Sequence, residues 1–343
     1  MVKTHLFLVL SLTMLMAACG EARRDQKKMH FLHKGNLSFK EKLYFDAVRY
    51  YREAIQLDSS FAQAYNNLGI VYFKTERAEE AVRAYDAALA LDPQFYDAYY
   101  NRSNANYALG NFAQVIADLN KIKEKSWPEA SLLFAKGMAF FGMKDYDSAQ
   151  FAFSKALQLD SANSEAYINL ATVLLYRKAY DQARTLARLG LDKAPDYPEA
   201  YNVLGMVEAA RGHYQMAIDL YDLGLSIEHN NAYLLNNRGY AFLQLQQYDP
   251  ALRDINESIV IDPQNAWAYQ NKGIYYYKKQ NILDAERLLR QATSMDSSLA
   301  LSWYYLGKLL PENGEKTLAC NALEQSMLLG DTLAGEAFNI HCQ

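Results

Sequence analysis

Apolar residues recur at intervals of three and four along almost the whole chain, which is the pattern of amphipathic helices. These stretches come in pairs, and the pairs repeat every 34 residues, so that Ala62 to Phe95 serves as a template. Small residues recur at position 8 of the template. They are Gly35, Gly69, Ser103, Gly137, Ala171, Gly205, Gly239, Gly273 and Gly307. The spacing needs no insertion or deletion from about residue 28 to residue 326.

Two further positions follow the same period. Eight of the nine residues at position 20 are Ala, and the exception is Val115. Position 24 is mostly large and apolar, as at Tyr51 and Tyr85. Small residues at positions 8 and 20 let two helices pack closely, and we expect the large residue at position 24 to fill the space between units. Each unit is therefore predicted to be a pair of packed helices.

The unit resembles the tetratricopeptide repeat in an aromatic-x₂-Leu-Gly-x₂-Tyr run and in the residues that follow it. In the template these are Tyr65, Leu68, Gly69, Tyr72, Ala81, Tyr85, Ala88 and Pro93. The resemblance implies an all-α fold, a right-handed superhelical solenoid with the first helix of each unit on the concave face. We expect about nine helix-turn-helix units over residues 28–330, followed by a C-terminal capping helix and tail over residues 331–343.

The third unit departs from this pattern. Val115 and Ile122 stand where small residues are usual, and Trp127-Pro128 ends the unit. Two outcomes are open at this stage. The larger residues can hold the helices apart and change the local curvature, or neighbouring side chains can compensate for the added volume.

The N-terminus has the pattern of a targeting segment. Lys3 precedes an apolar run from Leu6 to Met16, which is too short to span a bilayer and is typical of a signal peptide. Met16-Ala17-Ala18-Cys19 then resembles the bacterial lipobox, with Met in place of the usual Leu. The resemblance implies a signal peptide over residues 1–18, an acylated Cys19 and a short tether over residues 19–27. The alternative is an ordinary secretory signal with a chance cysteine.

The resemblance to a lipobox implies that the protein belongs to the bacterial cell envelope. Gly20 after the cysteine is not the Asp of an inner-membrane retention signal, so we expect a lipid anchor in the outer membrane, facing the periplasm. The tether is basic, and its side chains are expected to meet anionic lipid. They are Arg23, Arg24, Lys27 and Lys28.

Composition narrows the function classes. The chain has 343 residues, of which 51% are hydrophobic, and 35 Lys and Arg stand against 39 Asp and Glu. The hydrophobic content excludes bulk disorder, and the slightly acidic balance argues against nucleic acid as a partner. Three cysteines are too few for a disulfide-dense scaffold or a Cys₄ zinc site.

With Cys19 acylated, Cys320 and Cys342 remain in an oxidising compartment. Gly330 is expected to end the last repeat helix, and a closing helix over Thr332 to Ile340 would bring the two cysteines level. We therefore expect a disulfide between them. The alternative is two free or buried thiols.

Catalytic patterns are missing from the sequence. It contains no Gly-rich phosphate loop, no nucleophile elbow and no His-Glu-x-x-His. His30 and His33 have a ligand-like spacing without an evident third ligand. The prediction is a protein that is not an enzyme and holds neither a cofactor nor a metal.

The predicted concave face is the candidate binding surface. Position 6 carries a row of amides that can both donate to and accept from an extended peptide: Asn67, Asn101, Asn169, Asn237 and Asn271. Aromatic residues accompany the row: Tyr100, Tyr107, Phe134, Phe141, Tyr233, Tyr240, Trp267, Tyr277 and Tyr304. The alternatives are that the amides only help local packing and that the aromatics only line the space between helices.

The sequence therefore favours a membrane-anchored scaffold or adaptor that mediates protein–protein interactions in the bacterial envelope. Its expected partners are envelope proteins with extended peptide segments, together with the membrane through the N-terminal lipid. The alternative is a glycan- or cell-wall-binding envelope lipoprotein, because sugars stack on aromatic rings and bond to amides.

Overall fold

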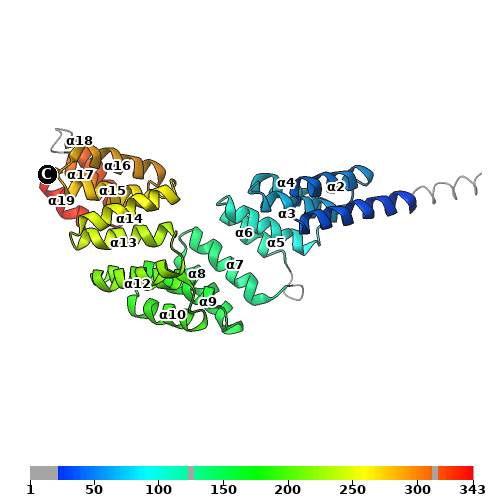
Figure 1. Ribbon diagram of the computed structural model, residues 1–343, viewed down its shortest axis with the longest axis horizontal. Coiled ribbons are helices and arrows are strands. Elements are labelled where there is room, and N and C mark those ends of the chain that lie inside the picture. The colour runs from blue at the N-terminus through cyan, green and yellow to red at the C-terminus, as the bar shows by residue number, and fades with distance from the viewer. Residues whose placement is uncertain (1–21, 123–126, 311–315, 343) are drawn as a thin grey trace, which may run out of the picture. The chain divides into compact units, whose positions relative to one another are not determined.

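The computed structural model describes residues 22–122, 127–310 and 316–342. The described ranges contain no strand, and their helices follow one another in consecutive pairs (Figure 1). The all-α fold of paired helices predicted from the sequence is confirmed. The chain forms two compact units, Met1–Ser161 and Ala162–Gln343, where a single array was expected. Repeats contact only their neighbours, so weaker packing at one turn is enough to divide an array.

The first unit begins with a helical segment over residues 22–40. The helices that follow it are α2 (Tyr44–Leu57), α3 (Ala62–Lys74), α4 (Ala78–Leu91), α5 (Tyr96–Ala108), α6 (Phe112–Leu119), α7 (Glu129–Gly142) and α8 (Tyr146–Leu159). The strongest packing lies within the predicted pairs, such as α3 with α4 and α7 with α8.

The second unit continues the same alternation. Its helices are α9 (Ser164–Tyr176), α10 (Tyr180–Lys193), α11 (Pro198–Ala210), α12 (Tyr214–Ile227), α13 (Ala232–Gln244), α14 (Tyr248–Ile261), α15 (Ala266–Lys278), α16 (Ile282–Met295), α17 (Ala300–Leu309), α18 (Lys316–Leu328) and α19 (Leu333–Cys342). The first helices of neighbouring repeats also contact one another, as α11 does with α9 and with α13. This second layer of contacts creates the face on which the candidate site lies.

Position 24 packs against the small residue of its own repeat, and the Tyr51 phenol also interacts with Asn67 of the next repeat. The ring at position 24 lies over the position 8 glycine of the same repeat, as Tyr85 lies over Gly69. In four repeats a Cβ on that glycine would come within 2.3 to 2.7 Å of the facing ring. These pairs are Gly35–Tyr51, Gly69–Tyr85, Gly137–Phe153 and Gly205–Tyr221. The small residue is needed because a large one occupies the partner helix.

The irregular third repeat has a short second helix. Helix α6 ends at Leu119 after eight residues, whereas α4 and α8 have fourteen. Val115 and Ile122 are both buried in one cluster with Leu119 and Leu132. The larger residues are thus absorbed into a local core.

The segment expected as a tether is helical from residue 22, so it extends the first helix of the first repeat. Lys28 forms ion pairs with Asp25 and Asp58, and Arg24 donates to the Leu57 carbonyl at the end of α2. The hydrogen bond from Lys28, together with bonds from Ser60, lowers the pKa of Asp58 to about 2. Two of the four basic residues expected at the lipid surface therefore bind the first repeat.

No helix among the described residues has both the length and the apolar character to cross a membrane.

Candidate binding groove

Amide side chains link the first helices of neighbouring repeats. At three places the Asn Nδ2 at position 6 donates to the Asn Oδ1 at position 5 of the preceding repeat. These bonds are Asn101 to Asn66 at 3.0 Å, Asn237 to Asn202 at 2.8 Å and Asn271 to Asn236 at 2.8 Å. Hydrogen bonds between partly buried amides fix the register of one repeat against the next.

The other two predicted amides are also engaged within the protein. Asn67 donates to Asn36 Oδ1 at 2.9 Å, and Asn169 donates to the Glu165 carbonyl of its own helix at 3.0 Å. The Nδ2 atom of every Asn in the row is therefore bonded. The row acts as a packing element, and ligand contact at these positions depends on the carbonyl oxygens.

Four of the predicted site residues line one pocket of about 440 Å³ in the second unit. They are Asn237, Tyr240, Trp267 and Asn271, from helices α13 and α15. The full lining is Leu175, Tyr176, Met206, Ala209, Ala210, Tyr214, Tyr221, Asn236, Asn237, Tyr240, Trp267, Gln270, Asn271 and Leu301. Within the described residues this lining contains no charged side chain. The volume is within the range of small-ligand pockets, ~300–1,000 Å³.

The aromatic side chains of the pocket differ in exposure. Trp267 is 47% exposed, which leaves a large ring face open for contact. Tyr240 is mostly buried, and burial raises its pKa to about 12, so its phenol is neutral at physiological pH. A half-open indole beside a buried phenol is suited to holding an apolar side chain.

Asn271 is buried to 3% exposure, and it has one unsatisfied atom. Among the described residues, no donor lies within hydrogen-bonding distance of its Oδ1. The amide orientation follows from its neighbours, because Nδ2 is 3.5 Å from the Asn236 main-chain oxygen, which can only accept. The pocket wall thus contains a buried acceptor that lacks a partner.

Three other predicted aromatics of the second unit lie outside this lining, namely Tyr233, Tyr277 and Tyr304. Tyr233 is 57% exposed. Tyr277 packs edge-on against Tyr305 with ring centroids 5.0 Å apart, and the Lys308 ammonium lies 5.7 Å from its ring. Burial lowers the pKa of Lys308, but the phenols of Tyr277 and Tyr304 outweigh that effect and raise it.

The remaining predicted aromatics lie in the first unit. Tyr100 stacks on Trp127 with ring centroids 4.3 Å apart, and Tyr107 contacts Phe112 edge-on at 5.4 Å. Tyr100 and Tyr107 line a smaller pocket of about 180 Å³ together with Asn104. The predicted groove residues therefore lie in different parts of the surface, and the 440 Å³ pocket brings amides of the row together with aromatics.

Sequence reasoning overlooked position 5 of the repeat. Asn236 and Gln270 line the large pocket and are 2% exposed, and Asn236 accepts the bond from Asn271. A signal for this was present in the sequence. Asn at position 5 is followed by Asn at position 6 of the next repeat in three cases, namely Asn66, Asn202 and Asn236.

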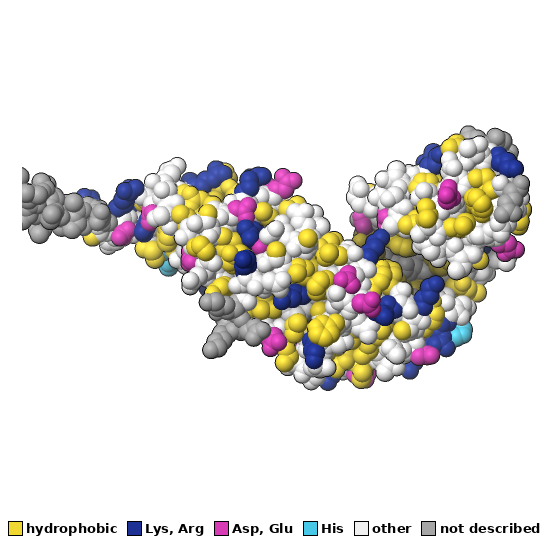
Figure 2. Space-filling view, turned by 180° about the vertical axis from the view of Figure 1, so that it is seen from behind, with side chains coloured by type: hydrophobic (Ala, Val, Ile, Leu, Met, Phe, Trp, Pro, Cys, Tyr) yellow, Lys and Arg dark blue, Asp and Glu magenta, His cyan; other side chains and the backbone are white. Residues whose placement is uncertain are grey.

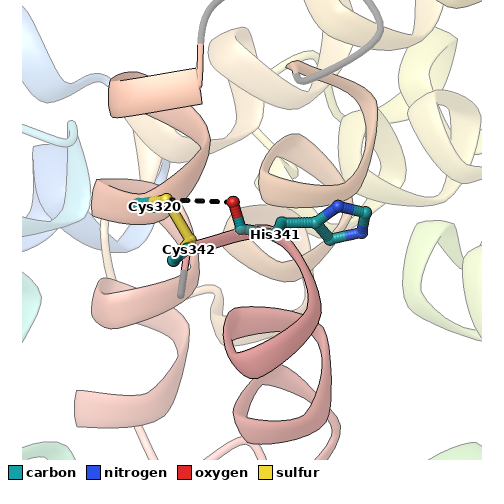
Figure 3. Close-up of a disulfide and its surroundings, with 3 residues drawn as sticks. All are labelled: Cys320, His341 and Cys342. Atoms are coloured by element: carbon teal, nitrogen blue, oxygen red, sulfur yellow. Dashed lines mark hydrogen bonds between the residues drawn. A yellow bond between two sulfur atoms is a disulfide. The ribbon is translucent and has the colours of Figure 1, made fainter.

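The structure contains a disulfide between Cys320 of α18 and Cys342 of α19 (Figure 3). The turn between these helices contains Gly330, whose φ of 87° favours glycine. The Cys320 sulfur also lies 3.9 Å from the His341 carbonyl, while the imidazole points away from the disulfide. The bond ties the closing helix to the last repeat.

Basic and acidic side chains are interspersed on the face shown in Figure 2 rather than gathered by sign. No group of three or more His, Cys, Asp or Glu within the described ranges could hold a metal ion. Cys19 lies outside the residues that the structure describes.

Family models match three stretches of the chain. Two models described as tetratricopeptide repeat match residues 62–95 and 140–207, and one described as TPR repeat matches residues 35–76. The chain contains tetratricopeptide repeats. No curated protein matches it significantly.

Solved structures show the same fold for the repeats. The crystal structure of the APC/C hetero-tetramer Cut9-Hcn1 aligns with a TM-score of 0.55 and 14% identity, over 95% of this chain and 88% of that one. The structure of Pseudomonas aeruginosa PilF aligns with a TM-score of 0.51 and 18% identity, over 62% of this chain and 96% of that one. At these identities the likeness concerns the fold alone.

Proposed function

We propose that this tetratricopeptide repeat protein is a scaffold that binds a segment of a partner protein in the pocket of its second unit lined by Tyr240 and Trp267. We further propose that an acylated Cys19 anchors it to a membrane of the bacterial envelope, in the outer membrane and facing the periplasm. In this role it holds an envelope protein close to the membrane and performs no catalysis itself.

The pocket lined by Asn237, Tyr240, Trp267 and Asn271 is the observation that carries the binding proposal. It offers the half-exposed ring of Trp267, and aromatic residues are the usual anchors of protein interfaces. The Cut9-Hcn1 structure is that of a hetero-tetramer, so a chain of similar fold takes part in a protein assembly there.

The envelope proposal draws on the sequence and on the disulfide. The apolar run from Leu6 to Met16 and the lipobox-like Met16–Cys19 favour export and acylation. A disulfide between Cys320 and Cys342 suits an oxidising compartment outside the cytoplasm.

One experiment tests both parts. The full chain, with Trp267 replaced by the photo-reactive amino acid benzoylphenylalanine, is produced in bacteria that have an outer membrane. The cells are then irradiated. The matched control places the same amino acid at Val260 of α14, which is 80% exposed and outside the pocket lining. Membrane and soluble fractions are compared for the parent chain and for Cys19→Ser.

We expect a discrete protein adduct from residue 267 and none from residue 260, and we expect Cys19→Ser to leave the membrane fraction. Equal labelling at both positions would contradict a pocket-centred function. A carbohydrate adduct at residue 267 would overturn the protein scaffold in favour of the glycan-binding alternative. Unchanged membrane retention of Cys19→Ser would refute the lipid anchor.

A further inference from the structure

The first repeat has an open face that the later repeats cover. In the third repeat, Arg102 of α5 donates to Asp86 of α4, which belongs to the preceding repeat, and Tyr99 packs against the same helix. Steps of 34 residues place Lys34 and Phe31 at these two positions of the first repeat. No helix precedes the first helical segment within the described residues, so this end of the array lacks a neighbouring repeat there.

Basic side chains and aromatic rings occupy this open face. Arg23, Lys27 and Lys34 are spaced by four and seven residues, so they lie on one side of the helical segment. Lys27 Nζ lies 5.9 Å from the centroid of the Phe31 ring, and Lys34 Nζ lies 5.4 Å from that of Tyr50. The two rings stack with their centroids 6.3 Å apart. The basic end face consists of Arg23, Lys27, Phe31, Lys34, Arg49 and Tyr50.

The charges of the basic end face are available to an anion. Lys27 and Lys34 lie over aromatic rings and pair with no carboxylate among the described residues. A ring attracts a cation without neutralising it, because the ring carries no net charge. Arg49 is shared, since it pairs with Asp46 at 2.9 Å and also lies 4.7 Å from the Tyr50 centroid.

The end of the chain that carries this face is basic, although the chain as a whole is acidic. Residues 22–43 contain seven Lys and Arg against two Asp and Glu, whereas the rest of the chain contains 28 against 37. A negatively charged surface is therefore attracted to this end and repelled by the remainder.

An exposed aromatic side chain lies beside the cations. Phe45 is the second residue of α2 and is 84% exposed. It precedes Arg49 by four residues, so the two side chains share one side of the helix. A phenylalanine next to basic residues is typical of surfaces that lie at the interface between headgroups and acyl chains.

We propose that the basic end face and Phe45 dock on the anionic headgroups of the membrane that holds the Cys19 anchor. Phosphate oxygens accept hydrogen bonds from Arg23, Lys27 and Lys34, and the Phe45 ring enters the boundary between headgroups and acyl chains. This inference rests on the proposed lipid anchor and adds the surface by which the folded repeats contact the bilayer.

The position of the anchor favours a bilayer as the occupant. The three residue steps from Cys19 to residue 22 span at most about 11 Å, so an acylated Cys19 keeps this end of the array at the headgroups. A lipid chain and a basic surface also reinforce one another, because each alone binds a membrane reversibly. An acidic protein segment could use the same cations, but it would not account for the nearby anchor.

The test measures the basic end face without its lipid. The probe is the mature chain from residue 19 with Cys19→Ser, which cannot be acylated. Its sedimentation with vesicles is compared for two compositions, phosphatidylethanolamine with about one third phosphatidylglycerol and phosphatidylcholine alone, at about 0.03 M salt, where screening is weak. Circular dichroism checks that each variant is folded.

Two triple variants remove equal charge from different places. Arg23→Gln/Lys27→Gln/Lys34→Gln neutralises the basic end face. Arg188→Gln/Lys193→Gln/Arg253→Gln is the matched control, because these three residues are exposed and belong to the second unit. We expect the first variant to bind anionic vesicles about a hundredfold more weakly, at about fivefold per residue, and the control less than about threefold more weakly.

The apolar contact has its own matched pair. Leu283 is the second residue of α16, stands at the same repeat position as Phe45 and is 80% exposed. Phe45→Gln should weaken binding to anionic vesicles about tenfold, whereas Leu283→Gln should leave it unchanged. Binding should disappear at about 0.5 M salt, because the attraction to phosphate is then screened.

Three results would overturn the inference. Equal losses in the two triple variants would show that only net charge matters. Equal binding to both vesicle compositions, or equal binding by Phe45→Gln and Leu283→Gln, would exclude the proposed contacts. A chain that ignores both vesicle types but binds poly-glutamate through Arg23, Lys27 and Lys34 would assign the face to an acidic protein segment.

Failure of this inference is distinguishable from failure of the proposed function. The basic end face alone is too weak to hold the chain at cellular ionic strength, so Cys19→Ser should still leave the membrane fraction. Retention of Cys19→Ser in cells, or absence of a protein adduct at residue 267, overturns the proposed function. The vesicle measurements with the two triple variants decide the docking surface independently of both.

Discussion

Replacing Gly69 by Ala tests how the two helices of a repeat fit together. A Cβ at this position would lie 2.5 Å from Tyr85 Cε1 and 2.8 Å from Cδ1, well inside the ~3.5–4.0 Å of an ordinary carbon contact. Tyr85 is 1% exposed, so its ring has little room to move. Ala favours a helix interior over Gly by about 1 kcal/mol, but overpacking a core costs about 1–3 kcal/mol. We expect a net destabilisation of about 1 kcal/mol.

The assay is urea unfolding followed by far-ultraviolet circular dichroism, with hydrogen exchange of α3 and α4 to localise the effect. A double-mutant cycle isolates the clash. Tyr85→Ala alone should cost about 3–5 kcal/mol, and Gly69→Ala added to it should then stabilise, because the ring is gone. The chain already contains this small pair in its fifth repeat, where Ala171 and Ala187 occupy the same two positions.

Gly335 of α19 is the control, since a Cβ there would have no neighbour within 4 Å among the described atoms. Gly335→Ala should be neutral or stabilising by up to about 1 kcal/mol. If Gly69→Ala stabilises the parent chain as Gly335→Ala does, the ring-on-glycine account of the repeat is refuted.

Three further predictions follow from single contacts. Reducing the Cys320–Cys342 bond, which closes a loop across a separation of 22 residues, should destabilise the closing helix by about 3 kcal/mol in thermal unfolding, and a Cys320→Ala/Cys342→Ala variant should not respond to reductant. Asp254→Ala should cost about 3 kcal/mol in urea unfolding, because it removes the buried carboxylate that pairs with Arg238 at 2.6 Å, whereas removal of the exposed partner Asp222 should cost less than about 1 kcal/mol. Burial raises the pKa of Tyr240 from 10.0 to about 12. The neutral phenol therefore contributes about 3 kcal/mol to the free energy of unfolding below pH 10, and this contribution is lost as the pH rises towards 12. Tyrosinate absorbance of Tyr240→Phe against the parent chain measures this titration, and ionisation of Tyr240 near pH 10 with helicity intact would contradict it.

The period of the sequence was enough to predict the fold, because each repeat places the same small and large residues in the same two helices. The contact between position 8 and position 24 of the same repeat could not be predicted from the period. The positions of Gly69 and Tyr85 both recur every 34 residues. A contact within one repeat and a contact between neighbouring repeats would therefore have the same period in the sequence. Only the orientation of the Tyr85 ring shows that the contact lies within the repeat.

The candidate site was predicted less completely than the fold. Helical spacing brings Asn237, Tyr240 and Trp267 to one face, and these residues do line one pocket. Helical spacing does not show whether an amide side chain points to solvent or to a side chain of the neighbouring repeat. That depends on the offset between adjacent repeats, which lets Asn271 donate to Asn236 and leaves its Oδ1 without a donor among the described residues.

Hydrogen exchange of the full chain, with and without the protein that cross-links at residue 267, tests the central claim most directly. The account predicts slower exchange in α11, α13 and α15, the helices that supply Met206, Asn237, Tyr240 and Trp267 to the pocket. Exchange in α14 and α16, which contribute no residue to the lining, should change little. Protection confined to α14 and α16, with α13 and α15 unchanged, would contradict the account.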